Sequence, residues 1–184
     1  TENIPNFQGL ASSFGLLYVP GSWMESLQVS KGTSSVKNGY ESITGQINVE
    51  YKKPENKEKL YVNLYANHAG RLEGNINSSI RVSPRWNTAV FGHVSNQSTL
   101  IDHNNDNFLD DPVFTQVNLF NRWNYHSEKM EGMFGVKFLN EIRKGGQVDY
   151  YASNEPAANN LYGTEIKTNR LEAFSKTGFF LKRP

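Results

Sequence analysis

The chain has 184 residues, a net charge of +1 and no cysteine. The near-neutral charge argues against a nucleic-acid-binding surface, and the lack of cysteine excludes disulfides and thiolate metal sites within this sequence. No apolar run approaches the roughly 18 residues of a membrane helix, which leaves a soluble protein or a β-barrel, whose alternating strands give no hydropathy peak. Aromatic residues make up 12%, and Gly and Asn are frequent, a mixture that favours strands and turns.

Two short strands are the first predicted elements. Residues 16–19 are apolar and precede Pro20-Gly21, which predicts a strand ended by a turn. Leu27 and Val29 alternate with polar residues, the pattern of a half-buried strand. A capped helical turn and another apolar row are predicted next, from Thr33 or Ser34, Gly39, Ile43, Ile47 and Val49. Spacing alone is equally consistent with two strands of any α+β domain.

The order of motifs in residues 22–54 is more specific. A strand ending in Lys-Gly is followed by Ser-Ser-Val, Gly-Tyr-Glu-Ser, Gly-Gln-Ile-Asn-Val and finally Lys-Lys-Pro. This order resembles the closing segment of the plug domain of TonB-dependent outer-membrane receptors. Thr33 stands where Pro is usual in the family, and Lys37-Asn38 replaces an apolar-aromatic pair. These departures leave the substrate of any subfamily open.

The resemblance implies a mainly all-β fold with two parts. Residues 1–54 would be the C-terminal part of a small α+β plug domain. Residues 55–184 would be about the first six strands of an antiparallel transmembrane β-barrel, which is incomplete here because six strands cannot enclose a plug. The chain is thus expected to be an internal piece of a longer receptor.

Six segments between residues 60 and 179 alternate with period two, as this implication requires. Their apolar rows are expected to face lipid, and their polar rows are expected to face the lumen. Val136 illustrates the first kind and Lys137 the second, so removal of Lys137 is expected to have a mild effect. The third segment, 88–94, is ambiguous because both of its rows are apolar. Aromatic residues near segment ends are predicted to form the interfacial girdles: Tyr61, Trp86, Trp123 and Tyr125.

The connections between segments also alternate in length. The turns near Pro84 and Ser127 are short, whereas Ser98–Thr115 and Arg143–Asn169 are long and polar. Barrels of this kind have short periplasmic turns and long extracellular loops. The pattern therefore predicts that the long stretches are cell-surface loops of a protein in the outer membrane of a Gram-negative bacterium.

The long loops contain the only candidate sites. Oxygen-bearing residues in the first loop follow a calcium-loop register, although Val113 replaces the expected bidentate Glu. The predicted Ca²⁺ ligands are Asp102, Asn104, Asp106, the Phe108 carbonyl and Asp110, with a solvated turn as the alternative. In the second loop, tyrosines offer contact area for a ligand: Tyr150, Tyr151 and Tyr162.

No catalytic motif is present, and we do not expect an enzyme. The four histidines lack ligand spacing and are expected in loops or the lumen: His68, His93, His103 and His126. No cofactor is predicted other than the possible Ca²⁺.

By resemblance, the leading hypothesis is active uptake of a scarce nutrient, such as a ferric siderophore or cobalamin. Its partners would be the nutrient, outer-membrane lipid and the inner-membrane TonB complex, which would contact a box upstream of Thr1. One alternative is a soluble extracellular β-sandwich, an adhesin or glycan-binding module with a calcium loop. Another is an outer-membrane receptor that signals without transport.

Overall fold

The computed structural model describes residues 9–32, 45–55, 58–153 and 160–181. The described part is mainly β, with two separate antiparallel sheets that do not close on themselves. One sheet has two strands, β1 (Met24–Lys31) and β2 (Gly45–Tyr51). The other has six strands, whose bounds are β3 (Leu60–Ala66), β4 (Arg71–Arg81), β5 (Trp86–Gln97), β6 (Val113–His126), β7 (Met130–Gly146) and β8 (Gly163–Phe179). The mainly β class with antiparallel sheets is confirmed.

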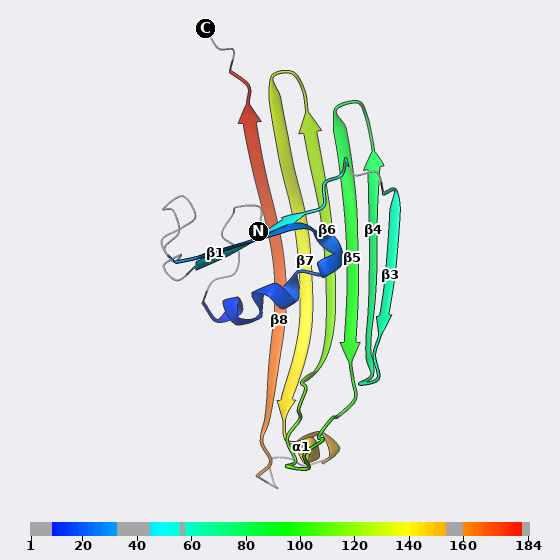
Figure 1. Cartoon of the computed structure of the whole chain (residues 1–184), viewed down its shortest axis with the longest axis vertical. Coiled ribbons are helices and arrows are strands. Elements are labelled where there is room, and N and C mark those ends of the chain that lie inside the picture. Colours follow the sequence, from blue (N-terminus) through cyan, green and yellow to red (C-terminus); the bar gives the residue numbers. More distant parts are fainter. Residues whose placement is uncertain (1–8, 33–44, 56–57, 154–159, 182–184) are drawn as a thin grey trace.

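The larger sheet is a meander in which each strand pairs with the next along the chain (Figure 1). The β4–β5 and β6–β7 turns lie together at what we call the short-turn end. The β5–β6 and β7–β8 connections lie at the opposite, long-loop end, where the second of them contains helix α1 (Val148–Ala152). The six predicted strands are present, but β6, β7 and β8 have 14, 17 and 17 residues and are longer than predicted. None of the short helices in the described part has the length and apolarity required to span a membrane.

The N-terminal segment lies across one face of the large sheet (Figure 1). It consists of two 3₁₀ helices, η1 (Gly9–Tyr18) and η2 (Gly21–Trp23), followed by β1 and β2. The strand predicted over residues 16–19 is wrong, because Val19 N–H donates to the Leu16 carbonyl at 3.2 Å and closes a turn before Pro20. The predicted strand around Leu27 exists, but its apolar row does not pack on a core, since Leu27 is 51% and Val29 is 61% exposed. The predicted cap and terminator of the helical turn lie outside the described residues.

An aromatic core joins the N-terminal segment to the large sheet. Trp23 is fully buried and packs on Phe91 of β5 and Phe120 of β6, with ring centroids 5.7 and 6.1 Å apart. Tyr51 of β2 completes the cluster, 4.9 Å from Phe120. Large aromatic side chains bury extensive apolar area, so this cluster fixes where the segment sits on the sheet.

Candidate functional site

The two faces of the large sheet differ in chemistry and in what covers them. The face away from the N-terminal segment, which we call the outer face, is apolar and exposed. Strand register places its apolar side chains in rows across the sheet. The members that are about half or more exposed are Leu60, Val62, Leu64, Leu72, Ile76, Ile80, Val90, Val94, Leu119, Val136 and Leu171. Soluble monomers rarely leave a contiguous apolar surface of this extent uncovered.

Aromatic residues gather on the outer face near the short-turn end. Trp86 of β5 packs against Trp123 and Tyr125 of β6 and Phe134 of β7, at centroid distances of 6.2, 4.8 and 5.9 Å. Trp123 also donates its indole N–H to Asn121 at 2.7 Å. Three of the four predicted girdle residues therefore form one cluster. The assignment of Tyr61 to the same girdle is wrong, because its ring lies on the other face, under the Lys52 ammonium at 4.7 Å.

Charged residues bound the apolar rows toward the long-loop end. Lys167 of β8 lies opposite Ile142, the next outward pair is Lys144 and Glu165, and Glu165 forms ion pairs with both lysines. On β7, ten residues separate this edge from Gly132, which lies opposite Tyr125 of the aromatic cluster. At about 3.4 Å per residue and a typical barrel tilt of about 40°, the rows span roughly 26 Å, close to the apolar band of a membrane barrel.

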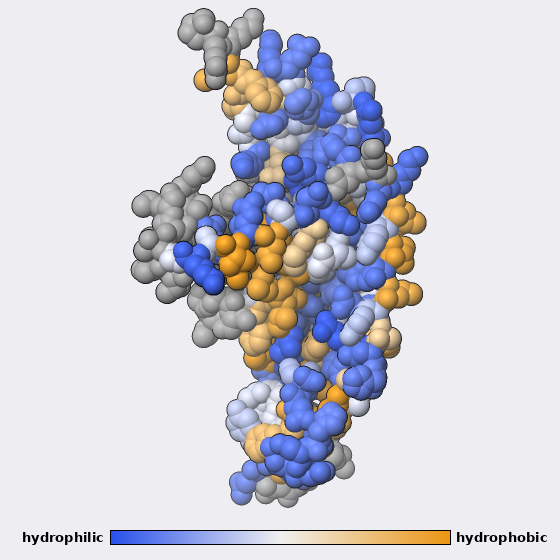
Figure 2. Space-filling model, in the orientation of Figure 1, coloured by the Kyte–Doolittle hydropathy of each residue, from blue (hydrophilic) through white to orange (hydrophobic). Residues whose placement is uncertain are grey.

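The opposite, inner face is polar yet largely covered. Figure 2 views the molecule from the side of the N-terminal segment and shows hydrophilic side chains over most of the strands. Many of these polar side chains are buried: Asn75, Asn77, His93, Gln116, Asn118, Arg122, Lys137 and Glu141. The third segment, which sequence left ambiguous, presents Ala89 and Phe91 to the N-terminal segment. Both of its rows are apolar because one of them joins this aromatic core.

Side chains of the inner face hold the N-terminal segment by its backbone. Carbonyl oxygens of the segment accept hydrogen bonds from four side chains of β4, β6 and β7. The bonds are Asn77 to Ser22 at 2.9 Å, Gln116 to Leu17 at 3.0 Å, Lys137 to Tyr18 at 3.1 Å and Arg122 to Tyr51 at 2.9 Å. Buried carbonyls must find donors, so the polar inner face and the segment satisfy each other.

Lys137 has a larger structural role than its sequence position indicated. Its side chain is buried, and Nζ donates both to the Tyr18 carbonyl and to the Tyr51 hydroxyl at 3.5 Å. Removal of this amine would leave the buried carbonyl without that donor. The expected mild effect of its removal therefore does not fit this environment.

Toward the long-loop end, the charges of the inner face are paired. Arg143 binds Glu141 through two bonds of 3.0 Å, and Arg71 binds Glu73 at 3.0 Å. Both guanidinium groups also lie over the Phe114 ring, at 5.5 Å for Arg71 and 4.6 Å for Arg143. The side chains of Arg143 and Glu141 are almost completely buried, so their two charges lose solvation, and the paired hydrogen bonds are needed to offset that loss.

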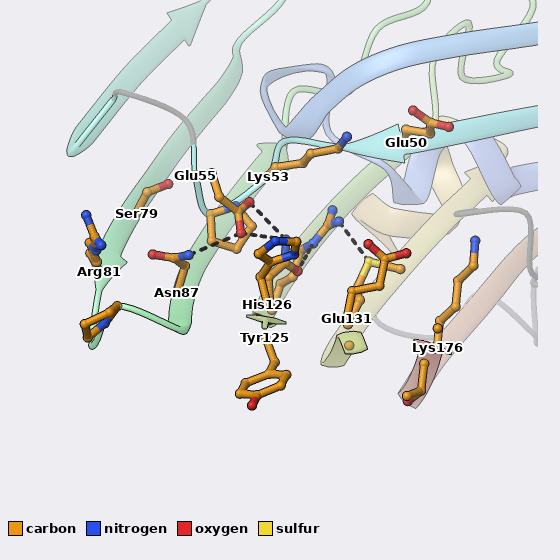
Figure 3. A pocket seen from close by; sticks show the side chains of 18 of the residues that line it. Glu50, Lys53, Glu55, Ser79, Arg81, Asn87, Tyr125, His126, Glu131 and Lys176 are labelled. Carbon is orange, nitrogen blue, oxygen red and sulfur yellow. Dashed lines mark hydrogen bonds between the residues drawn. The ribbon is translucent and has the colours of Figure 1, made fainter. Parts of the chain in front are cut away.

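A groove of about 940 Å³, which we call the short-turn groove, lies between the inner face and the described residues that connect β2 to β3, among them Lys53, Pro54, Glu55 and Lys59 (Figure 3). Glu55 projects into it and accepts hydrogen bonds from Asn87 at 3.3 Å and from Asn124 at 3.0 and 3.1 Å. Its cationic lining residues are Lys53, Lys59, Arg81, Arg122 and Lys176. This groove is the main feature that sequence reasoning missed, because its lining comes from five separate stretches of chain.

The two long connections dock on each other. Phe108 pairs with Gln147 in an isolated bridge, and Val148 N–H donates to the Asn107 carbonyl at 2.9 Å. The rings of Phe108 and Tyr162 lie 6.5 Å apart. Residues 98–112 therefore meet residues 147–153 and 160–162 at one tip of the molecule.

Of the predicted contact tyrosines, Tyr162 is the most open to solvent, at 58% exposure. Tyr151 is partly buried and donates its hydroxyl to the Gly145 carbonyl at 2.9 Å. Burial, followed by the charges of Tyr150 and Glu165, raises the pKa of Tyr151. Its hydroxyl is thus committed to the strand ends, while Tyr162 is available to a ligand.

The predicted calcium residues lie close together in residues 102–110, where they support a turn. Asp102 accepts backbone N–H bonds from Asp106 and Asn107 at 3.2 and 2.9 Å, and Asp106 accepts one from Phe108 at 2.8 Å. Bonds from the backbone and side chain of His103 lower the pKa of Asp110. Within the described ranges, no group of three or more His, Asp or Glu side chains is arranged to hold a metal ion. Calcium binding stays a prediction.

The other histidines have separate surroundings. His93 is buried on the inner face and bonds Asn75 at 2.8 Å, whereas His68 lies in the β3–β4 turn and His126 ends β6.

Comparison with known proteins gave no match to any protein-family model, curated protein or solved structure.

Proposed function

We propose that this chain is part of a TonB-dependent outer-membrane receptor that takes up a large, scarce nutrient, such as a ferric siderophore or cobalamin. In this proposal residues 1–54 are the end of the plug and residues 55–184 are about the first six strands of the barrel wall. The motif order in residues 22–54 and the two-faced sheet support it. Unpaired backbone in hydrocarbon is costly, so the outer edges of β3 and β8 must pair with further strands.

The observation that carries the proposal is which face is covered. In a soluble sheet the apolar face packs on the core and the polar face meets water. Here the polar face holds the N-terminal segment, while the apolar face is exposed between an aromatic cluster and a row of ion pairs. A wall with lipid outside and a plug inside has this arrangement.

The long-loop end would then face the cell exterior, and the short-turn end would face the periplasm. The tip formed by Phe108 and Tyr162 would meet the nutrient first. The N-terminal segment blocks the inner face, so release would require it to move, with energy supplied through the TonB complex. Side chains of the sheet donate hydrogen bonds to backbone carbonyls of the N-terminal segment, and water can replace these donors when the segment moves.

The soluble β-sandwich remains the second candidate, because the apolar face could instead pack on another sheet. Fractionation separates the two. The receptor should sediment with outer membranes and need detergent for extraction, whereas an adhesin domain should be soluble without detergent.

Uptake tests the function itself. Cells that express the full receptor should accumulate a radiolabelled ferric siderophore or cobalamin, and accumulation should stop when the proton gradient is collapsed or TonB is deleted. Binding without accumulation would instead favour a signalling receptor. Membrane localisation with neither binding nor uptake across a panel of such nutrients would contradict the proposal.

A further inference from the structure

The short-turn groove differs in charge pairing from the rest of the inner face. At the long-loop end, Arg71 and Arg143 each bind a glutamate. At the short-turn end, Arg81 of β4 and Lys176 of β8 share one level of the sheet, through the register Arg81–Asn87–Asn124–Met133–Lys176. In the part of the chain that the structure describes, neither cation has an ion-pair partner.

The residues between β2 and β3 add cations of the same kind. Lys53 follows β2 and Lys59 directly precedes β3; both line the groove, and neither forms an ion pair with any described residue. Arg122, deeper in the groove, is fixed on the Tyr51 carbonyl. Figure 3 shows Lys53, Arg81 and Lys176 around the opening, with no hydrogen bond drawn to any of them.

The carboxylates of the groove do not balance these cations. Three glutamates line it against five lysines and arginines, which leaves a charge of +2. Among the described residues no cation forms an ion pair with Glu55, whose carboxylate oxygens instead accept hydrogen bonds from the amides of Asn87 and Asn124. Glu50 accepts a bond from Ser26 at 3.3 Å, on β1. The remaining carboxylate, Glu131, lies at the edge near the β6–β7 turn.

We infer that the short-turn groove is a binding site for a multiply charged anion. Single exposed cations contribute little, but several that line one concave site concentrate anions there. The backbones of Arg81 and Lys176 are four strand steps apart, which is about 19 Å at 4.8 Å per step, and their long side chains extend into the groove between them. A ligand held by several of these cations must carry several negative charges, as a polycarboxylate does.

This inference rests on the proposed function in one respect. If the chain is a transporter wall, the groove lies at the periplasmic side of the plug, on the route of release. The cargo would then be an anionic chelate, not a neutral nutrient, and the groove would receive it after it passes the N-terminal segment.

Citrate and its uncharged triethyl ester are suitable probes, since they share one carbon skeleton and differ in charge. Binding of each to the full protein in detergent can be measured by calorimetry at low and moderate salt. We expect citrate to bind and the ester not to bind. The variant Arg81→Gln/Lys176→Gln should bind citrate at least about tenfold more weakly, and Lys53→Gln/Lys59→Gln should show the same direction of change if the first variant folds poorly.

The matched control is Lys144→Gln/Lys167→Gln, which removes the same charge from the outer face. Its citrate affinity should equal that of the unmodified protein. Equal affinity in all variants, or no binding of citrate to the unmodified protein, would overturn the inference. Citrate binding without nutrient uptake would contradict the transport function alone, whereas uptake with no citrate binding would contradict the groove alone.

Discussion

Val136→Arg tests whether the outer face meets hydrocarbon. Val136 points outward from β7, and its neighbours in register are Asn121 of β6 and Ala173 of β8. Gly132 marks the level of the aromatic cluster, and Val136 lies four residues from it along β7. At a strand tilt of about 40°, these four residues correspond to about 10 Å along the membrane normal. In a band about 25 Å tall this position is near the middle, so the arginine should cost about 2–4 kcal/mol.

Ile142→Arg is the matched control. Ile142 points outward from the same strand but lies six residues further on, beside Lys167 at the charged edge. There the same substitution should cost only about 0–1 kcal/mol. The assay is equilibrium folding of the full protein into lipid vesicles against denaturant, followed by tryptophan fluorescence. Equal costs at the two positions would refute the assignment of the apolar rows to hydrocarbon.

Three further predictions concern the inner face and the loops. Lys137→Met should weaken the docking of the N-terminal segment by about 1–3 kcal/mol, which would appear as faster amide hydrogen exchange around Trp23 and Tyr51. The control Lys167→Met, at an exposed lysine, should leave that exchange unchanged. Ca²⁺ titration of the full protein should release heat that the Asp102→Ala/Asp106→Ala variant lacks; identical heats would assign residues 102–110 to a solvated turn. An epitope tag inserted at Asn105 should bind antibody on intact cells, and labelling only after the outer membrane is opened would reverse the proposed topology.

The alternating rows made the large sheet predictable from the sequence. Period-two patterning identified all six strands, and it assigned Val136 and Lys137 to opposite faces correctly. Strand ends were less predictable, because β7 and β8 continue past the apolar rows on residues such as Lys144 and Glu165. Backbone pairing persists there without a hydropathy signal.

The contacts of the inner face could not be predicted, because they join residues far apart in sequence. Lys137 reaches Tyr18 across 119 positions, and Arg122 reaches Tyr51 across 71. Polar alternation says that such side chains share a face, but it does not say what covers that face. The strand predicted over residues 16–19 failed for a related reason. These residues have the composition of a strand, but their packing and the turn before Pro20 decide their conformation.

The proposed arrangement requires that the outer face meets lipid while the inner face meets the N-terminal segment. Residues 1–184 contain no cysteine, so single cysteines introduced at positions 134, 136, 137, 138 and 139, in a full protein without other reactive cysteines, can be labelled with a nitroxide. In the full protein in lipid vesicles, collision with apolar oxygen and with a water-soluble nickel chelate is then measured by electron paramagnetic resonance. We predict high oxygen and low nickel accessibility at positions 134, 136 and 138, and low accessibility to both at 137 and 139. Low oxygen accessibility at the first three positions would mean that protein covers the apolar face, and would contradict the account.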